Sequence, residues 1–173
     1  MNMLRQTFVL LFFASILGFG VNSFHPNAIP LIGEYRELSE GSEPVVPPSA
    51  SEGDPPFIAI NEAKLDHEAG SSLFIDARDP SEFECGTIPG SINMPFDYLP
   101  EDSLELYMDS VLSGAAKEQS LIVFCSGEEC DVSLHLARNL QAFGYTGVKI
   151  FFGGAREWGK FKYEVEERVN CAE

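Results

Sequence analysis

Basic residues are scarce in this chain of 173 residues, which has 11 Lys and Arg against 27 Asp and Glu. The formal net charge of −16 gives the folded part of the chain a surface that repels nucleic-acid phosphates and anionic lipid headgroups. We therefore expect no nucleic-acid partner, and we expect contact with a membrane only through an apolar segment of the chain.

Cysteine and histidine are scarce as well. Four cysteines are too few for a disulfide scaffold in a chain of this length, and they suit local chemistry better. Cys125, Cys130 and His135 could in principle bind zinc or copper, but no second ligand pair accompanies them. We expect no metal site and no cofactor. Cys85 is expected to be a small buried residue, and Cys171 an exposed residue open to intermolecular bonding.

One long apolar run is present, from Phe8 to Val21. It matches the core of a signal peptide and is shorter than the roughly 20 residues that span a bilayer. We assign residues 1–24 to a signal peptide or an N-terminal membrane anchor. Because Arg5 favours an N-terminus that stays inside, we expect the rest of the chain to be exported. It would remain anchored on the extracytoplasmic (periplasmic) side, or it would be secreted after cleavage.

Residues 25–56 are expected to form a linker. The segment SEGSEPVVPPSASEGDPP is dense in Pro, Ser, Gly and Glu, and such a composition buries too little apolar surface to order itself. We expect it to hold a folded domain away from a membrane.

Short apolar runs alternate with amphipathic stretches from residue 57 to residue 170. The runs predict five strands, at FIAI, SLFIDAR, SINMP, SLIVFC and GVKIFF. Asn61 is expected to cap a helix that Gly70 ends, and Asp79 followed by Pro80 predicts the start of a short second helix. This alternation predicts an α/β domain with a central parallel sheet of about five strands flanked by helices.

Cys125 stands at the end of the apolar strand SLIVFC, before a loop and a helix that opens near Asp131. Functional sites in open parallel sheets form at the carboxyl ends of strands. Loop N–H groups and the positive end of a helix dipole lower the pKa of a thiol and hold an anion. The segment therefore predicts that Cys125 is a nucleophile.

Three segments resemble the motifs of a single rhodanese-like (sulfurtransferase) domain, in that family's order and spacing. FIDARDPSEFECGTIPGSINMP is similar to its first signature, VFCSGEECDVS to its active-site strand and loop, and FFGGAREW to its closing Gly-Gly-x-x-x-Trp element. The resemblance covers residues 57–170 and implies a rhodanese-like fold. It also implies that Cys125 takes up a sulfane sulfur as a persulfide and passes it to an acceptor thiol.

The loop departs from the family pattern Cys-Arg-x-Gly-x-Arg-Ser in its charge. Glu128, Glu129 and Asp131 are acidic, and Cys130 stands about where the family has an arginine. Each carboxylate raises the pKa of a nearby thiol and repels a dianionic donor. We therefore expect inefficient use of thiosulfate, and a protein persulfide or a small-molecule persulfide as the donor.

Cys130 has three open interpretations. It could attack a persulfide on Cys125, releasing sulfide and leaving a Cys125–Cys130 disulfide for a thioredoxin-like reductant to reduce. It could instead be a packing cysteine under the helix, or a metal ligand. The other loop residues are expected to contact the substrate: Ser126, Gly127, Glu128, Glu129 and Asp131.

Three residues outside the loop are expected to be structural. Asp76 and Arg78 could touch substrate, but we expect Arg78 to reach Glu82 on the following helix instead. Trp158 is expected to pack against the sheet.

Taken with the resemblance, the sequence predicts a rhodanese-like sulfurtransferase or persulfide redox protein that uses Cys125 as its nucleophile. Its expected partners are a small-molecule or protein sulfur donor, a thiol acceptor and a thioredoxin-like reductant. The alternative is a catalytically inactive rhodanese-like module that serves in protein interaction or sensing.

Overall fold

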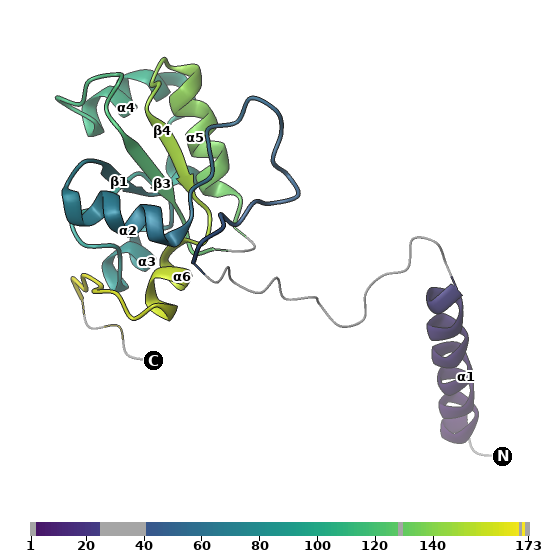
Figure 1. Cartoon of the computed structure of the whole chain (residues 1–173). Coiled ribbons are helices and arrows are strands. Elements are labelled where there is room, and N and C mark those ends of the chain that lie inside the picture. Colours follow the sequence, from purple (N-terminus) through teal and green to yellow (C-terminus); the bar gives the residue numbers. More distant parts are fainter. Residues whose placement is uncertain (1–2, 25–40, 128–129, 170, 172–173) are drawn as a thin grey trace. The chain divides into compact units, whose positions relative to one another are not determined.

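The computed structural model describes residues 3–24, 41–127, 130–169 and 171 (Figure 1). The chain divides into two compact units, Met1–Arg36 and Glu37–Glu173. In the first unit, helix α1 (Met3–Phe24) contains a window, Arg5–Asn22, with a mean hydropathy of 1.3. This helix is long and apolar enough to cross a membrane, and a signal sequence has the same properties. Anchor and signal peptide both remain predictions.

A parallel sheet forms the centre of the second unit, with four strands in the described residues, in the order β2-β1-β3-β4 (Figure 1). The strands are β1 (Leu73–Asp76), β2 (Ile92–Asn93), β3 (Leu121–Phe124) and β4 (Val148–Phe151). The α/β class is confirmed, but the expected fifth strand, FIAI, forms only a single parallel bridge between Phe57 and Ile150. The chain enters a helix at Ile60, which leaves too little extended chain for a strand.

Within the described residues of the second unit, five helices connect and cover the strands. They are α2 (Ile60–Ala69), α3 (Pro80–Cys85), α4 (Leu104–Val111), α5 (Val132–Ala142) and α6 (Gly154–Lys160). Two single turns of 3-10 helix precede α4, at Phe96–Tyr98 and Glu101–Ser103.

Of the three ends predicted for α2 and α3, two are confirmed and one is wrong. The Asp79 side chain accepts a hydrogen bond from the Ser81 N–H at 2.8 Å, with Pro80 in the first turn of α3. Gly70 ends α2 in the left-handed conformation, with φ of 61°. The predicted cap at Asn61 is wrong, because α2 begins two residues earlier than that cap implies and Ala59 occupies the cap position. Asn61 therefore lies inside the first turn.

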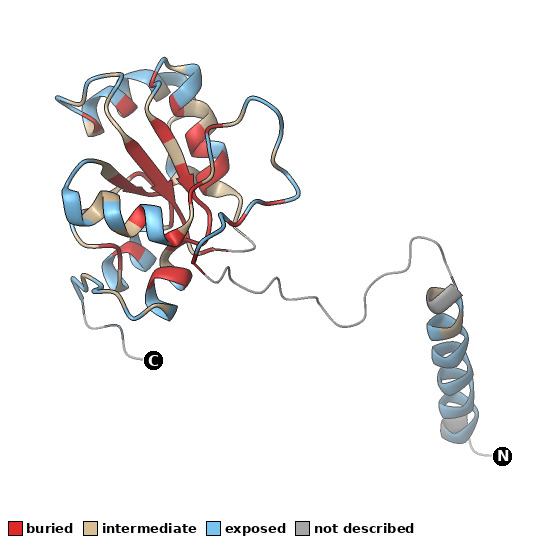
Figure 2. Cartoon of the chain, viewed as in Figure 1, coloured by how far each residue is buried: buried red, intermediate tan, exposed pale blue. Residues whose placement is uncertain are grey.

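The strands present alternate side chains to two layers of helices. Ile75, Val123 and Ile150 lie in register across the sheet and belong to a core that includes residues of α4 and α5. Phe124 and its neighbour Phe151 belong to a second core, with α2 and α6. Figure 2 shows the buried residues concentrated in the strands and in the inward faces of the helices. Trp158 packs there, 1% exposed, as expected.

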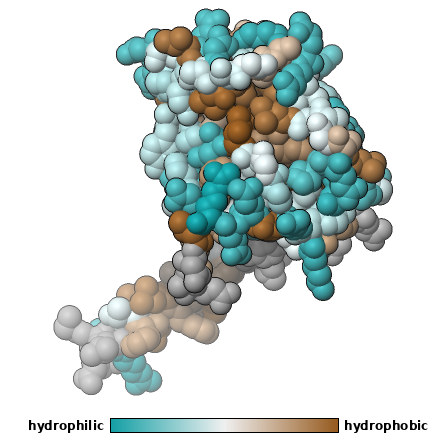
Figure 3. Space-filling view, turned by 90° about the vertical axis from the view of Figure 1, so that its left-hand side faces the viewer, coloured by the Kyte–Doolittle hydropathy of each residue, from teal (hydrophilic) through white to brown (hydrophobic). Residues whose placement is uncertain are grey.

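Part of the segment assigned to the linker packs against the domain. Val45 is buried in the core formed with α4 and α5. Arg138 on α5 donates to both carboxylate oxygens of Asp54, at 2.7 and 2.8 Å, and to the Ser49 carbonyl at 3.0 Å. The packed domain thus includes residues 41–56, whereas residues 25–40 of the assigned linker lie outside the described residues. On the face of this unit that Figure 3 shows, hydrophilic side chains surround an apolar area.

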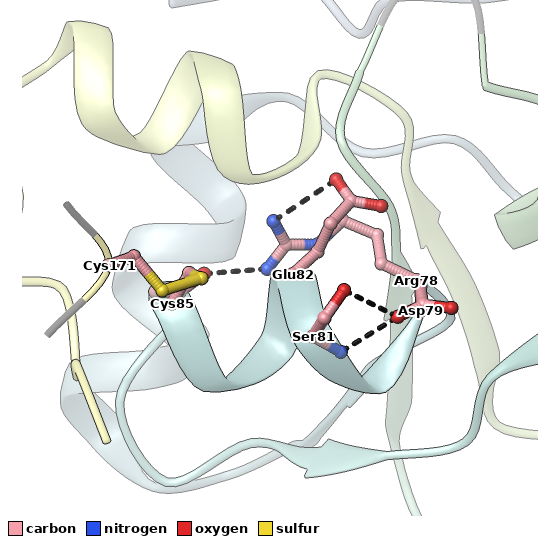
Figure 4. The surroundings of a disulfide bond; sticks show 7 residues. Arg78, Asp79, Ser81, Glu82, Cys85 and Cys171 are labelled. Atoms are coloured by element: carbon pink, nitrogen blue, oxygen red, sulfur yellow. Dashed lines mark hydrogen bonds and ion pairs between the residues drawn. A yellow bond between two sulfur atoms is a disulfide. The ribbon is translucent and has the colours of Figure 1, made fainter. Parts of the chain in front are cut away.

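The segment that follows α6 is tied to α3 and to the turn after it. Thr87 and Glu166 exchange two backbone hydrogen bonds of 3.0 and 2.9 Å, and the Arg168 N–H donates to the Glu84 carbonyl at 2.9 Å. These contacts bring together Cys85 and Cys171, which form a disulfide (Figure 4). The expectation for Cys85 is wrong, because Cys85 is exposed. Cys171 is exposed as expected, but it is bonded within the chain rather than open to intermolecular bonding.

Candidate active site

Cys125 directly follows β3, one of the two inner strands of the sheet. Its side chain is fully buried. The chain then passes through a loop and enters α5 at Val132. The structure therefore has the predicted order of strand, cysteine, loop and helix, at the carboxyl end of a parallel sheet where sites commonly form.

The start of this loop is held by α6. The Ala155 N–H donates to the Cys125 carbonyl at 2.9 Å, and the Arg156 N–H donates to the Ser126 carbonyl at 3.1 Å. Gly127 has φ of 125°, and a Cβ there would lie 2.8 Å from the Gly153 carbonyl oxygen. Glycine is therefore required at Gly127, both for its backbone conformation and for space. The Gly153-Gly154 turn lies against the loop, so these two residues shape the site.

The loop brings Cys125 and Cys130 together as two unbonded thiols. Cys125 Sγ donates to the Cys130 carbonyl oxygen at 2.7 Å and lies 3.3 Å from Ser133 Oγ. Cys130 is half-buried, and its N–H donates to the Gly127 carbonyl at 2.9 Å. The two sulfurs thus share one loop but differ in their access to solvent.

The two thiols also differ in acidity. Burial raises the pKa of Cys125 well above its ordinary value, and the hydrogen bond and charge of Cys130 raise it further, against hydrogen bonds from Ser133 and Gly127. The hydrogen bond with Cys125 lowers the pKa of Cys130 to about 6 despite partial burial, with help from Ser126 and the Val132 N–H. The pair therefore titrates as a coupled unit, in which burial disfavours the thiolate on Cys125 and the loop and helix donors favour it on Cys130.

The structure describes only one of the three acidic residues of the loop. Glu128 and Glu129 lie outside the described residues. Asp131 is half-buried at the N-cap position of α5, where its side chain makes no capping hydrogen bond. His135, one turn further, stacks on the ring of Phe96 with 5.5 Å between ring centroids. Among the described residues, no group of three or more metal-ligating side chains lies together.

Arg78 and Asp76 form a buried ion pair, with 2.6 Å between Arg78 Nη2 and Asp76 Oδ2. Arg78 also reaches Glu82, as expected, but only at 3.9 Å. Burial lowers the pKa of Arg78, but the hydrogen bonds to Asp76 outweigh it, and the charges of Asp76, Glu82 and Cys125 add to the rise. Arg78 is therefore held in a structural ion pair with Asp76, and its contact with Glu82 is the one that was predicted.

Two residues near the loop were missed by the sequence analysis. Ser133 is fully buried beside Cys125 Sγ; its place in the first turn of the helix after the loop was an available signal. The Arg156 Cβ lies 3.6 Å from the position that a Cβ would occupy if Gly127 had one. No local pattern predicts this contact, because α6 follows the next strand.

Comparisons with known proteins agree with this geometry. The sequence model of the rhodanese-like domain family matches residues 59–161. Thiosulfate:glutathione sulfurtransferase of Homo sapiens is 30% identical over 110 residues, which cover 60% of this chain and 92% of that protein. Chloroplastic thiosulfate sulfurtransferase 16 of Arabidopsis thaliana is 31% identical over 91 residues, covering 50% of this chain and 73% of that protein. The structure of the human single-domain sulfurtransferase TSTD1 aligns with a TM-score of 0.51 at 27% identity, covering 62% of this chain and 97% of that one.

Proposed function

Because this chain belongs to the rhodanese-like domain family and its relatives include sulfurtransferases, we propose that it transfers sulfane sulfur carried as a persulfide on Cys125. The observation that carries the proposal is the pair of unbonded thiols in the loop after β3. One thiol is buried among loop and helix groups, and the other is partly open to solvent. A persulfide needs a thiolate to form and a protected place to persist, and this pair offers both.

The proposed donor is a persulfide, either of a small thiol or of a protein. Both relatives have thiosulfate in their names, but this loop has Cys130 about where the family has an arginine, and its sequence adds Glu128, Glu129 and Asp131. A dianion is repelled by such a loop more strongly than a singly charged persulfide group. We propose that Arg156, whose Cβ lies 3.6 Å from the position that a Cβ would occupy on Gly127, attracts one such group.

Two acceptors are open to the persulfide on Cys125. An external thiol can attack its outer sulfur and take it away. Alternatively, Cys130 can attack its inner sulfur, so that sulfide leaves and a Cys125–Cys130 disulfide remains. A thioredoxin-like protein would then supply the two electrons that restore both thiols.

We propose that this chemistry takes place outside the cytoplasm, on the periplasmic side if α1 is a retained anchor. The Cys85–Cys171 disulfide is exposed, and disulfides of this kind persist in oxidising compartments. Helix α1 is suited to be either an anchor or a signal sequence.

The test is a transfer assay with two donors, glutathione persulfide and thiosulfate, and a small thiol as acceptor. We expect transfer from the persulfide in the wild type, weak transfer from thiosulfate, and loss of both when Cys125→Ser is combined with Cys130→Ser. If the double variant transfers sulfur as fast as the wild type, the loop is not the site. If thiosulfate is the better donor, the proposed donor class is wrong.

The non-catalytic module predicts a buried and inert Cys125. Cys125 is indeed buried, but a second thiol with a pKa of about 6 lies in the same loop. Because loop and helix donors favour the thiolate on Cys130, we do not expect the loop to be inert, and we favour the enzyme.

A further inference from the structure

We propose that Cys130, rather than Cys125, is the first thiol to accept sulfur from the donor, and that it then hands the sulfur to Cys125. This inference rests on the proposed function and deepens it, because it assigns an order to the two thiols of the site. It makes Cys130 a catalytic residue, where the family has an arginine that carries no sulfur.

Cys125 is poorly placed to meet a donor. Its residue surface is 0% exposed, so a sulfur atom brought by another molecule cannot contact Sγ while the loop keeps this conformation. Sγ also lies only 2.7 Å from the Cys130 carbonyl oxygen, and burial raises the pKa of its thiol well above the ordinary value. Cys125 is therefore covered and disfavoured as a thiolate, and a protonated thiol is a weak nucleophile.

Cys130 has the properties that Cys125 lacks. It is half-buried, so part of its surface faces solvent. Its sulfur interacts with the hydroxyl and N–H of Ser126 and with the N–H of Val132, the first residue of α5. These are the loop and helix-start donors that the sequence analysis assigned to the persulfide of Cys125. In this chain they stabilise a thiolate on Cys130, in agreement with its lowered pKa.

The transfer proceeds in two balanced steps. The Cys130 thiolate attacks the outer sulfur of a donor R–S–SH, the donor's sulfur–sulfur bond breaks, and R–S⁻ leaves, giving Cys130–S–SH. Cys125 then attacks the outer sulfur of this persulfide and gives up its thiol proton. The bond within the Cys130 persulfide breaks, and Cys130 leaves with that proton, so that the products are Cys125–S–SH and Cys130–SH. Neither step needs an oxidant or a reductant.

The test determines which of the two cysteines receives the donor's sulfur first. Wild type, Cys125→Ser and Cys130→Ser are mixed with limiting glutathione persulfide, quenched with an alkylating reagent at increasing times, and digested with a protease that cleaves after glutamate. Cleavage after Glu128 or Glu129 places the two cysteines on separate peptides for mass spectrometry. Cys130→Ala is included as a second variant, and thermal unfolding of each protein checks that it is folded.

We expect the wild-type persulfide on Cys130 at the earliest times and on Cys125 later. Cys125→Ser should gain sulfur on Cys130 at about the wild-type rate, whereas both Cys130 variants should gain sulfur on Cys125 at least about tenfold more slowly. If the Cys130 variants load Cys125 at the wild-type rate, the proposed order is overturned while the sulfurtransferase proposal stands. If no protein gains sulfur on either residue, the proposed function fails and the order fails with it.

Discussion

The molecule has two cysteine pairs that contrast in almost every respect. Cys85 and Cys171 lie 86 residues apart in sequence, are exposed, and form a disulfide. Cys125 and Cys130 lie five positions apart, one buried and one half-buried, and are unbonded. The distant pair joins a C-terminal segment to α3, and the close pair is built into the loop after β3.

The contrast shows that surroundings, more than cysteine itself, decide what a cysteine pair does. A disulfide between exposed ends of two segments constrains the unfolded chain and has no neighbours suited to exchange sulfur. A pair with hydrogen-bond donors around one sulfur and burial around the other has unequal acidities, which favour directed sulfur transfer. We therefore expect removal of the close pair to abolish sulfur transfer and removal of the distant pair to lower stability.

The largest effect should follow removal of the close pair. In the variant that combines Cys125→Ser with Cys130→Ser, transfer from glutathione persulfide should fall roughly a thousandfold or more, because no nucleophilic thiol remains in the loop. Steady-state assays with a thiol acceptor measure this. The matched control, Cys85→Ser with Cys171→Ser, should keep the transfer rate within about threefold at a temperature where it is folded. An equal loss of rate in the control would mean that the two pairs do not have separate roles.

Removal of the distant pair should act on stability. Cys85→Ser should lower the free energy of unfolding by about 2–4 kcal/mol, because the disulfide closes a long loop of the unfolded chain. Urea titrations of the variant and of the wild type with and without a reductant measure this. The reduced wild type should match the variant, and Cys130→Ser should respond to the reductant as the wild type does. A wild-type midpoint that the reductant leaves unchanged would show that the disulfide adds nothing to stability.

A basic residue at position 130 should shift the choice of donor. Compared with Cys130→Ser, which also lacks the Cys130 thiol, Cys130→Arg should transfer sulfur from thiosulfate about tenfold faster, because a positive charge near Cys125 attracts a dianion and favours the thiolate. The comparison separates the new charge from the lost thiol. If the serine variant transfers sulfur from thiosulfate as fast as the arginine variant, charge is not what limits the use of thiosulfate.

The smallest effect is a shift in acidity within the close pair. The alkylation rate of Cys130 by iodoacetamide should rise with pH around a midpoint of about 6. In Cys125→Ala the midpoint should move upward, because the hydrogen bond from Cys125 is the main cause of the lowered pKa. Cys125→Ser keeps a hydroxyl donor and should shift less. A midpoint that does not change in the alanine variant would contradict the coupling between the two thiols.

Sequence analysis predicted the features that local signals encode. The apolar run before Cys125, Asp79 with Pro80, and Gly70 each act within a few residues, and the structure has the strand, the helix start and the helix end that they predict. The prediction of a strand at Phe57 was wrong, because the apolar pattern of this segment does not show how soon the next helix begins.

Features that depend on tertiary packing could not be predicted from the sequence. The Cys85–Cys171 bond requires the C-terminal segment to return to α3, which no local pattern shows. The difference between Cys125 and Cys130 depends on which sulfur the fold covers. For the same reason the buried ion pair between Arg78 and Asp76 could not be predicted, although the contact of Arg78 with Glu82 was expected.

The central claim is that the loop after β3 carries the transferred sulfur. Its most direct test is the intact mass of the protein, with the Cys85–Cys171 disulfide formed, after incubation with glutathione persulfide. Wild type and the Cys85→Ser with Cys171→Ser variant should each gain about 32 Da per bound sulfur atom, and the gain should disappear on treatment with a reductant. The Cys125→Ser with Cys130→Ser variant should gain nothing. A persistent gain in that last variant, or a gain that requires Cys85, would contradict the assignment of sulfur transfer to the loop after β3.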